Sequence, residues 1–171
     1  ILGTQMKAVG EVMSIGKTFK EAFQKAIRSL EIGAYGLGFL RGTPGLTLDE
    51  LRGRLGFPSS KRVFFMAEAL RLGMSVDELQ RLTHIGLYFI KEMKELVDFE
   101  ESLLTYRWDT LPKAKLIQAK EWGFSDRYLA ALFNVLEEEV RKQRVSYGKR
   151  VRFDTVPVSG VENAAYYYST Y

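Results

Sequence analysis

Apolar residues recur along most of this chain at steps of three and four, the spacing that places them on one face of an α-helix. The first such run lies within residues 18–31 and contains Phe19, Ala22, Phe23, Ala26, Ile27 and Leu30. Thr18, followed three residues later by Glu21, has the pattern of a capping box, which defines the start of a helix. The chain is therefore expected to open its folded part with an amphipathic helix.

Helix signals of the same kind divide the region from 47 to 148. The capping box is repeated at Thr47-Leu48-Asp49-Glu50 and at Ser75 with Glu78, while Ser59, Ser125 and the pair Thr110 and Pro112 also favour helix starts. Glycines follow several of the apolar runs, as expected at helix ends. We therefore expect further helices at roughly 47–56, 59–73, 75–82, 86–105, 110–123, 125–132 and 134–148.

These segments together predict an all-α fold. It is an irregular multi-helix bundle of about seven or eight helices, with extended terminal segments. Tight turns join the helices, and the connection near residues 106–110 divides them into two sub-bundles, roughly 19–106 and 110–148.

The pattern changes after Gly148. Val151, Phe153 and Thr155 alternate with charged residues, a period of two that predicts one extended segment. The chain then closes on Tyr166-Tyr167-Tyr168-Ser169-Thr170-Tyr171, with four tyrosines in six residues. We expect these aromatic side chains to pack on a neighbouring domain outside this sequence.

Composition narrows the chemistry available to the chain. Its 171 residues are 46% hydrophobic and 27% charged, which suits about one domain with a core that needs no disulfide or metal. Without Cys there is no thiolate nucleophile or iron–sulfur ligand, and the lone His84 cannot build a multi-histidine zinc site. No apolar run approaches about 18 residues, so no membrane span is expected. The net charge of +4 is weak support for an anionic partner.

A few residues could still be imagined in a functional site. His84 could act as a general base, but a packed or surface histidine is the better interpretation, because no partner or pocket can be assigned to it. Gly36-Leu37-Gly38 lacks the third glycine and the preceding strand of a dinucleotide-binding turn. Lys7, Glu11 and Lys17, near Gly10 and Gly16, are either the remnant of a nucleotide site or ordinary charged residues.

Three consecutive glutamates, Glu137, Glu138 and Glu139, are the remaining candidate metal ligands. Successive helical residues point about 100° apart, so the three cannot converge on one ion, and a solvated helix start explains them better. The residues therefore predict no catalytic, cofactor-binding or metal-binding site within this chain.

An alternative function is DNA binding by a helix-turn-helix. Residues 125–144 have its rhythm, with a turn at Asn134 and a second helix that carries Arg141 and Arg144. The first turn of that second helix would present three glutamates to phosphates, which opposes the hypothesis. A stand-alone enzyme, the third possibility, has only scattered carboxylates in its favour.

A resemblance extends these inferences. The opening segment, 5–18 (QMKAVGEVMSIGKT), resembles the end of the first ATP-grasp half of the carbamoyl-phosphate synthetase large chain. The similarity continues through Lys25-Ala26-Ile27-Arg28-Ser29-Leu30-Glu31 and Ala67-Glu68-Ala69-Leu70-Arg71. It also includes Gly123-Phe124-Ser125-Asp126-Arg127 and the closing tyrosine-rich segment.

The resemblance implies a place in a larger enzyme. Residues 1–18 would be the last part of the carboxyphosphate half, 19–155 the helical oligomerization domain, and 156–171 a linker into the carbamoyl-phosphate half. The parent ligase makes carbamoyl phosphate from bicarbonate, ATP and the nitrogen of ammonia or glutamine, for arginine and pyrimidine biosynthesis. Its ATP and divalent metal would bind in the flanking domains, with no cofactor in this segment.

The same resemblance implies the partners, although this sequence differs from the family pattern at two places. The partners are the flanking ATP-grasp domains, a second large chain and a glutaminase small chain, in the cytoplasm, with no nucleic acid or membrane. The family usually has an acidic residue at the position of Gly86, and Asp-Thr-Cys-Ala-Ala-Glu near the end, where this chain continues Asp154-Thr155 with 156–159 (VPVS). The isolated segment is expected to be inactive, as a piece cut from a longer chain.

Overall fold

The computed structural model describes residues 12–38 and 45–171. Within these residues the chain forms eight α-helices, one short 3-10 helix and two strands. In chain order they are α1 (Phe19–Ser29), α2 (Leu48–Leu55), α3 (Arg62–Arg71), α4 (Val76–Thr83), α5 (Leu87–Leu104), η1 (Trp108–Thr110), α6 (Lys113–Glu121), α7 (Asp126–Phe133), α8 (Glu137–Ser146), β1 (Arg152–Pro157) and β2 (Ala165–Thr170). The predicted mostly helical bundle is confirmed.

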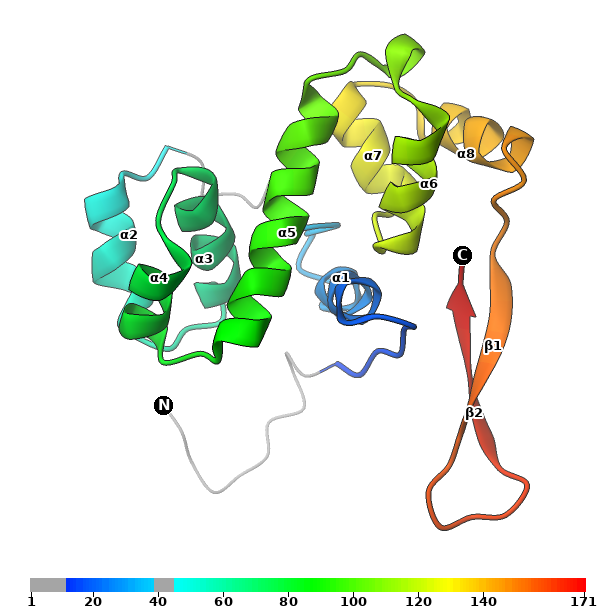
Figure 1. Cartoon of the computed structure of the whole chain (residues 1–171), viewed down its shortest axis with the longest axis horizontal. Coiled ribbons are helices and arrows are strands. Elements are labelled where there is room, and N and C mark those ends of the chain that lie inside the picture. The colour runs from blue at the N-terminus through cyan, green and yellow to red at the C-terminus, as the bar shows by residue number, and fades with distance from the viewer. Residues whose placement is uncertain (1–11, 39–44) are drawn as a thin grey trace.

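The long helix α5 lies between two groups of shorter helices (Figure 1). Helices α2, α3 and α4 pack together on one side of α5, and α6, α7 and α8 lie on the other side, along its C-terminal half. Helix α1 packs against α5 as well. The two predicted sub-bundles are therefore present, with α5 shared between them. No helix in the described part of the chain is long and apolar enough to span a membrane.

The helix starts test the capping predictions one by one. Thr18, Thr47, Ser75 and Ser125 each accept a backbone N–H bond at the start of a helix, as predicted. Only Thr47 forms the full reciprocal box, since the carboxylates of Glu21 and Glu78 bind Lys17 N–H and Arg52 instead.

The last helix begins at Glu137 and not at the predicted Asn134, because Asn134 instead ends α7 in the left-handed conformation. The helix starts predicted at Ser59 and Thr110 were also wrong. Ser59 does not cap α3, which begins at Arg62 after a turn in which the Ser59 carbonyl accepts the Arg62 N–H bond at 3.1 Å. Thr110 does not open α6 but ends η1, and Pro112 is the N-cap of α6. In both cases the chain makes a turn before the helix, and residue type alone does not reveal it.

A buried polar network joins the two helix groups through α5. Tyr128 donates from Oη to Glu100 at 2.7 Å, and Arg71 donates to the other oxygen of Glu100 at 2.9 Å. The Gly38 N–H in turn donates to Tyr128 Oη at 2.9 Å. A Cβ at Gly36 would lie 2.7 Å from the Tyr128 ring. The two glycines of Gly36-Leu37-Gly38 thus allow close packing on a tyrosine, which accounts for the motif without a phosphate.

The end of the chain forms a two-stranded antiparallel hairpin. Strand β1 pairs with β2 from Arg152 opposite Thr170 to Pro157 opposite Ala165. The single extended segment predicted at 150–155 is therefore one half of a pair that the sequence did not reveal. The pairing also crosses the expected domain boundary between residues 155 and 156, which stays a prediction.

Candidate functional site

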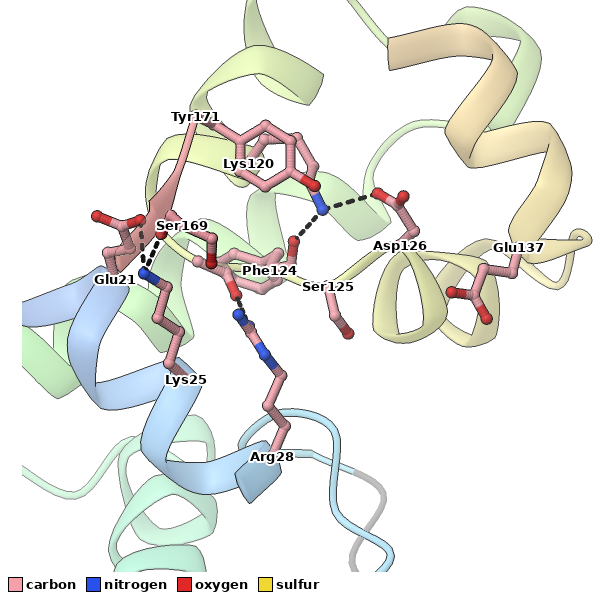
Figure 2. A pocket seen from close by; sticks show the side chains of 11 residues that line it. Glu21, Lys25, Arg28, Lys120, Phe124, Ser125, Asp126, Glu137, Ser169 and Tyr171 are labelled. Carbon is pink, nitrogen blue, oxygen red and sulfur yellow. Dashed lines mark hydrogen bonds and ion pairs between the residues drawn. The ribbon is translucent and has the colours of Figure 1, made fainter. Parts of the chain in front are cut away.

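A polar cavity of about 160 Å³ lies where α1, the turn between α6 and α7, and the end of β2 meet (Figure 2). Its charged lining residues come from distant parts of the sequence: Glu21, Lys25, Arg28, Lys120, Asp126 and Glu137. Ser169 and Tyr171 reach the same cavity from the end of the chain. The cavity therefore marks the place where the last strand is attached to the helices.

Lys120 of α6 is the buried centre of this region, with 1% of its surface exposed. Its Nζ donates to the Phe124 carbonyl at 2.6 Å and pairs with Asp126 at 2.7 Å. Burial lowers the pKa of Lys120 to about 8, against the opposing effect of Asp126. The ammonium is thus held in the interior by only a few well-placed oxygens.

Asp126 is shared between two cations. Besides Lys120 it accepts a bond from Nε of Arg144 at 2.7 Å, which joins the start of α7 to α8. Burial alone would raise the pKa of Asp126, but Lys120 and Arg144 together hold it below its usual value. We call Lys120, Asp126 and Arg144 the cation cluster.

The last residue of the chain covers the cation cluster. The ring centroid of Tyr171 lies 4.7 Å from Lys120 Nζ and 5.2 Å from the Arg144 guanidinium. A cation held over an aromatic face is attracted by the ring quadrupole, and more strongly where water is excluded. Tyr171 therefore attaches the end of β2 to α6 and α8.

Lys25 of α1 makes a second attachment, and it involves both ends of the described chain. Its Nζ donates to the Ile15 carbonyl at 2.7 Å and also to the Ser169 carbonyl. It pairs with Glu21 at 3.1 Å and lies 5.3 Å from the Tyr168 ring. One ammonium thus joins the segment before α1 to strand β2. The expectation that all the closing tyrosines pack elsewhere was wrong for Tyr168 and Tyr171, which contact the chain's own cations.

Helix α1 is itself fixed to α5 and to the turn between α6 and α7. Arg28 donates to the Gly123 carbonyl at 2.8 Å, and Lys20 pairs with Glu92 of α5 at 2.7 Å. Gly123 has a positive φ of 90°, and a Cβ there would lie 3.0 Å from the backbone of Glu21. Glycine is thus required for the α6–α7 turn to approach α1.

The structure places the other predicted candidates apart from this cavity, with one exception. His84 ends α4 in the left-handed conformation and is exposed, in agreement with the surface interpretation. Glu137, Glu138 and Glu139 form the exposed first turn of α8, and of these only Glu137 lines the cavity. Among residues 12–38 and 45–171 no group of three or more His, Asp or Glu residues could hold a metal ion. Lys7, Gly10 and Glu11 lie outside the described residues, while Lys17 pairs with Asp154 at 3.7 Å.

The predicted helix-turn-helix pattern corresponds to two helices, α7 and α8, that pack against each other. Asn134 ends α7 with a φ of 53°, and α7 packs on α8. Arg144, which the DNA-binding hypothesis needs on the surface, is only 8% exposed and is bound to Asp126. A buried arginine cannot contact phosphates, so this geometry gives no support to DNA binding.

Lys25, Lys120 and their partners were not identified as a site from the sequence. One signal was available for Lys120: it follows Leu116 and Ala119 at helical spacing, so it occupies the buried face of α6. Its partners could not be inferred, because Asp126, Arg144 and Tyr171 come from three other elements.

Comparison with known proteins identifies the class of this chain. Residues 11–148 match the family model described as the carbamoyl-phosphate synthetase large chain, oligomerisation domain. The chain belongs to this family.

Curated relatives agree with the family model over nearly the whole chain. The carbamoyl phosphate synthase large chain of Archaeoglobus fulgidus is 50% identical over 100% of this chain, and that of Thermotoga neapolitana is 42% identical over 99%. The N-terminal section of the large chain of Aquifex aeolicus is 46% identical over 99%. This chain spans 16%, 15% and 30% of those three relatives, respectively.

Proposed function

We propose that this oligomerisation domain also connects the two catalytic halves of a carbamoyl phosphate synthase large chain and fixes their relative position. The whole protein would make carbamoyl phosphate from bicarbonate, ATP and the nitrogen of ammonia or glutamine. This reaction would take place in the cytoplasm and supply arginine and pyrimidine biosynthesis. ATP and a divalent metal would bind in the flanking ATP-grasp domains, and a glutaminase small chain would be a further partner.

One observation carries the proposal: Lys25 holds the segment before α1 and strand β2 at the same point. Its Nζ binds the carbonyls of Ile15 and Ser169, which are 154 residues apart in the sequence (169 − 15). The ion pair between Lys17 and Asp154 joins the segment before α1 to β1, the other strand of the hairpin. The two segments that lead into and out of this domain therefore lie next to each other at Lys25.

The polar contacts of Lys25 suit a connection that keeps the two attached segments in one relative orientation. Carbonyl and carboxylate acceptors around the half-buried ammonium of Lys25 are satisfied in few arrangements, whereas apolar contacts tolerate sliding. Holding two catalytic parts in one relative position lowers the entropic cost of passing an intermediate between them. Such a role requires no catalytic group in this domain.

The test is Lys25→Met in the full-length large chain, with Lys142→Met as the matched control. The Lys142 side chain is 73% exposed and pairs with Glu138, one turn before it. We expect Lys25→Met to lower overall carbamoyl phosphate synthesis about tenfold, as is typical when reacting groups are slightly misplaced. The bicarbonate-dependent ATP hydrolysis of the first half should change far less. Equal loss of both activities, or no loss of either, would contradict the connecting role.

The isolated 171-residue chain tests the remaining part of the proposal. It should show no bicarbonate-dependent ATP hydrolysis, because the catalytic groups would lie in the flanking domains. Detectable hydrolysis by a purified preparation would disprove this. Sedimentation at several concentrations should reveal the self-association expected of an oligomerisation domain.

A further inference from the structure

The two faces of the β1–β2 hairpin differ in what covers them. On one face lie Asp154, Tyr168 and Thr170, which share that face because Asp154 is opposite Tyr168 and Thr170 is two residues further on. This face contacts α1 and the segment before it: Tyr168 lies over Lys25, Asp154 pairs with Lys17, and Thr170 is buried.

The opposite face carries Phe153 and Tyr167. The register places Phe153 opposite Ser169 and Thr155 opposite Tyr167, so the two aromatic residues are diagonal neighbours on the same face. Each is 75% exposed, among the highest values for large hydrophobic residues in the described chain. An exposed aromatic pair on one face of a sheet is typical of a surface that another layer covers.

The hairpin also lacks the support that a sheet of this size requires. Two strands form the whole sheet in the described residues, and all six residues of β1 are exposed. An isolated two-stranded hairpin is marginally stable in water, and its unpaired edges invite further pairing or packing. The structure therefore points to a partner on the Phe153–Tyr167 face.

We propose that this face is the docking surface for the part of the large chain that follows residue 171. The proposal rests on the proposed connecting function and names the partner surface for it. This chain spans 16% of the Archaeoglobus fulgidus relative, so a large chain of that length has polypeptide outside this sequence that could be the partner.

The position of Tyr171 favours polypeptide after residue 171 over a second copy. Tyr171 is held on the cation cluster, so the polypeptide that follows begins beside β2. A tethered segment competes at a high effective concentration with any free molecule. The segment that follows therefore reaches the exposed aromatic face first.

Site-specific photo-crosslinking in the full-length large chain tests this assignment. Phe153→benzoylphenylalanine is compared with Phe57→benzoylphenylalanine, because Phe57 is also a phenylalanine with 75% exposure and lies between α2 and α3. We expect the crosslinks from position 153 to map to peptides after residue 171, with a yield that does not depend on protein concentration. Position 57 should give no crosslinks to those peptides.

Three results would overturn the proposal: no crosslink at position 153, crosslinks only to a second copy with concentration-dependent yield, or crosslinks only to polypeptide before this domain. A second measurement uses the variant Phe153→Ser with Tyr167→Ser. Docking predicts about tenfold faster amide exchange in β1 and β2 of the full-length chain, because local opening is no longer opposed. Unchanged exchange would contradict it.

The crosslinking experiment and the Lys25→Met experiment can succeed or fail independently of each other. If Lys25→Met uncouples the two halves while position 153 fails to crosslink, the connection stands and the docking surface is wrong. If position 153 crosslinks as expected while Lys25→Met has no effect, the surface stands and the connecting role is wrong.

Discussion

The α2–α4 side of the molecule and the cavity around Lys25 and Lys120 are held together by different interactions. Residues such as Leu51, Phe64 and Leu79 bury their side chains completely or nearly so against the other helices. The cavity instead uses buried cations, a shared carboxylate and backbone carbonyls. Apolar burial supplies most of the folding free energy, whereas buried ion pairs add little net stability but cost a great deal when one partner is removed. The comparison indicates that the first region keeps the domain folded and the second fixes where its ends lie.

The largest effect on stability is expected in the apolar region. Phe64→Ala removes a side chain that is 1% exposed and should lower the free energy of unfolding by about 3–5 kcal/mol. Phe57→Ala, at 75% exposure, should change it by less than about 0.5 kcal/mol. Urea denaturation followed by circular dichroism measures both. If both variants lost a similar amount of unfolding free energy, the proposed difference between the buried Phe64 and the exposed Phe57 would be wrong.

The cation cluster should respond almost as strongly when its carboxylate is neutralised. Asp126→Asn leaves Lys120 and Arg144 buried without their counter-charge and should cost about 3 kcal/mol of unfolding free energy. Adding Lys120→Met to the same variant should recover part of this loss, because one uncompensated charge is then gone. A double variant that is less stable than Asp126→Asn would show that Lys120 contributes mainly through its other contacts.

Close packing around Tyr128 should be the next most sensitive feature. Gly36→Ala places a Cβ 2.7 Å from the Tyr128 ring and should lower the free energy of unfolding by about 1–3 kcal/mol. Gly53→Ala, inside α2 with no atom within 4 Å of its Cβ, should instead stabilise the domain by up to about 1 kcal/mol. Thermal melting compares the two, and the same sign of shift for both would contradict the packing argument.

The smallest change, counted per pH unit, is the pH dependence of stability that comes from Lys120. Its pKa is lowered to about 8 in the folded protein from an ordinary 10.5, so burial of the charged form opposes folding below pH 8. Between about pH 8 and 10.5 the unfolded chain binds the extra proton, and stability should therefore rise with pH, by at most about 1.4 kcal/mol per unit. The slope should be smaller in Lys120→Met, as measured by urea denaturation across this range. An identical slope in the variant would assign the effect to another group.

The helical region was the part that sequence could predict. Periodic apolar positions and the caps at Thr18, Thr47, Ser75 and Ser125 gave the helices, because these signals act within one turn. The second strand of the hairpin was missed because its tyrosines occupy successive positions and so give no alternation between two faces.

The cavity could not be assembled from sequence for a different reason. Lys25, Lys120 and Ser169 come together only through tertiary packing, and nothing local to any one of them specifies the other two. The resemblance to a known family located the domain within a larger enzyme, but it carried no information on these contacts.

Lys25 holds the segment before α1 and the hairpin in one relative position. Spin labels at Met13→Cys and Thr155→Cys in the full-length large chain, with distances measured by pulsed electron paramagnetic resonance, report that position directly. We expect a single narrow distance distribution that broadens when Lys25→Met is added and stays narrow with Lys142→Met. A distribution that Lys25→Met leaves unchanged would contradict it.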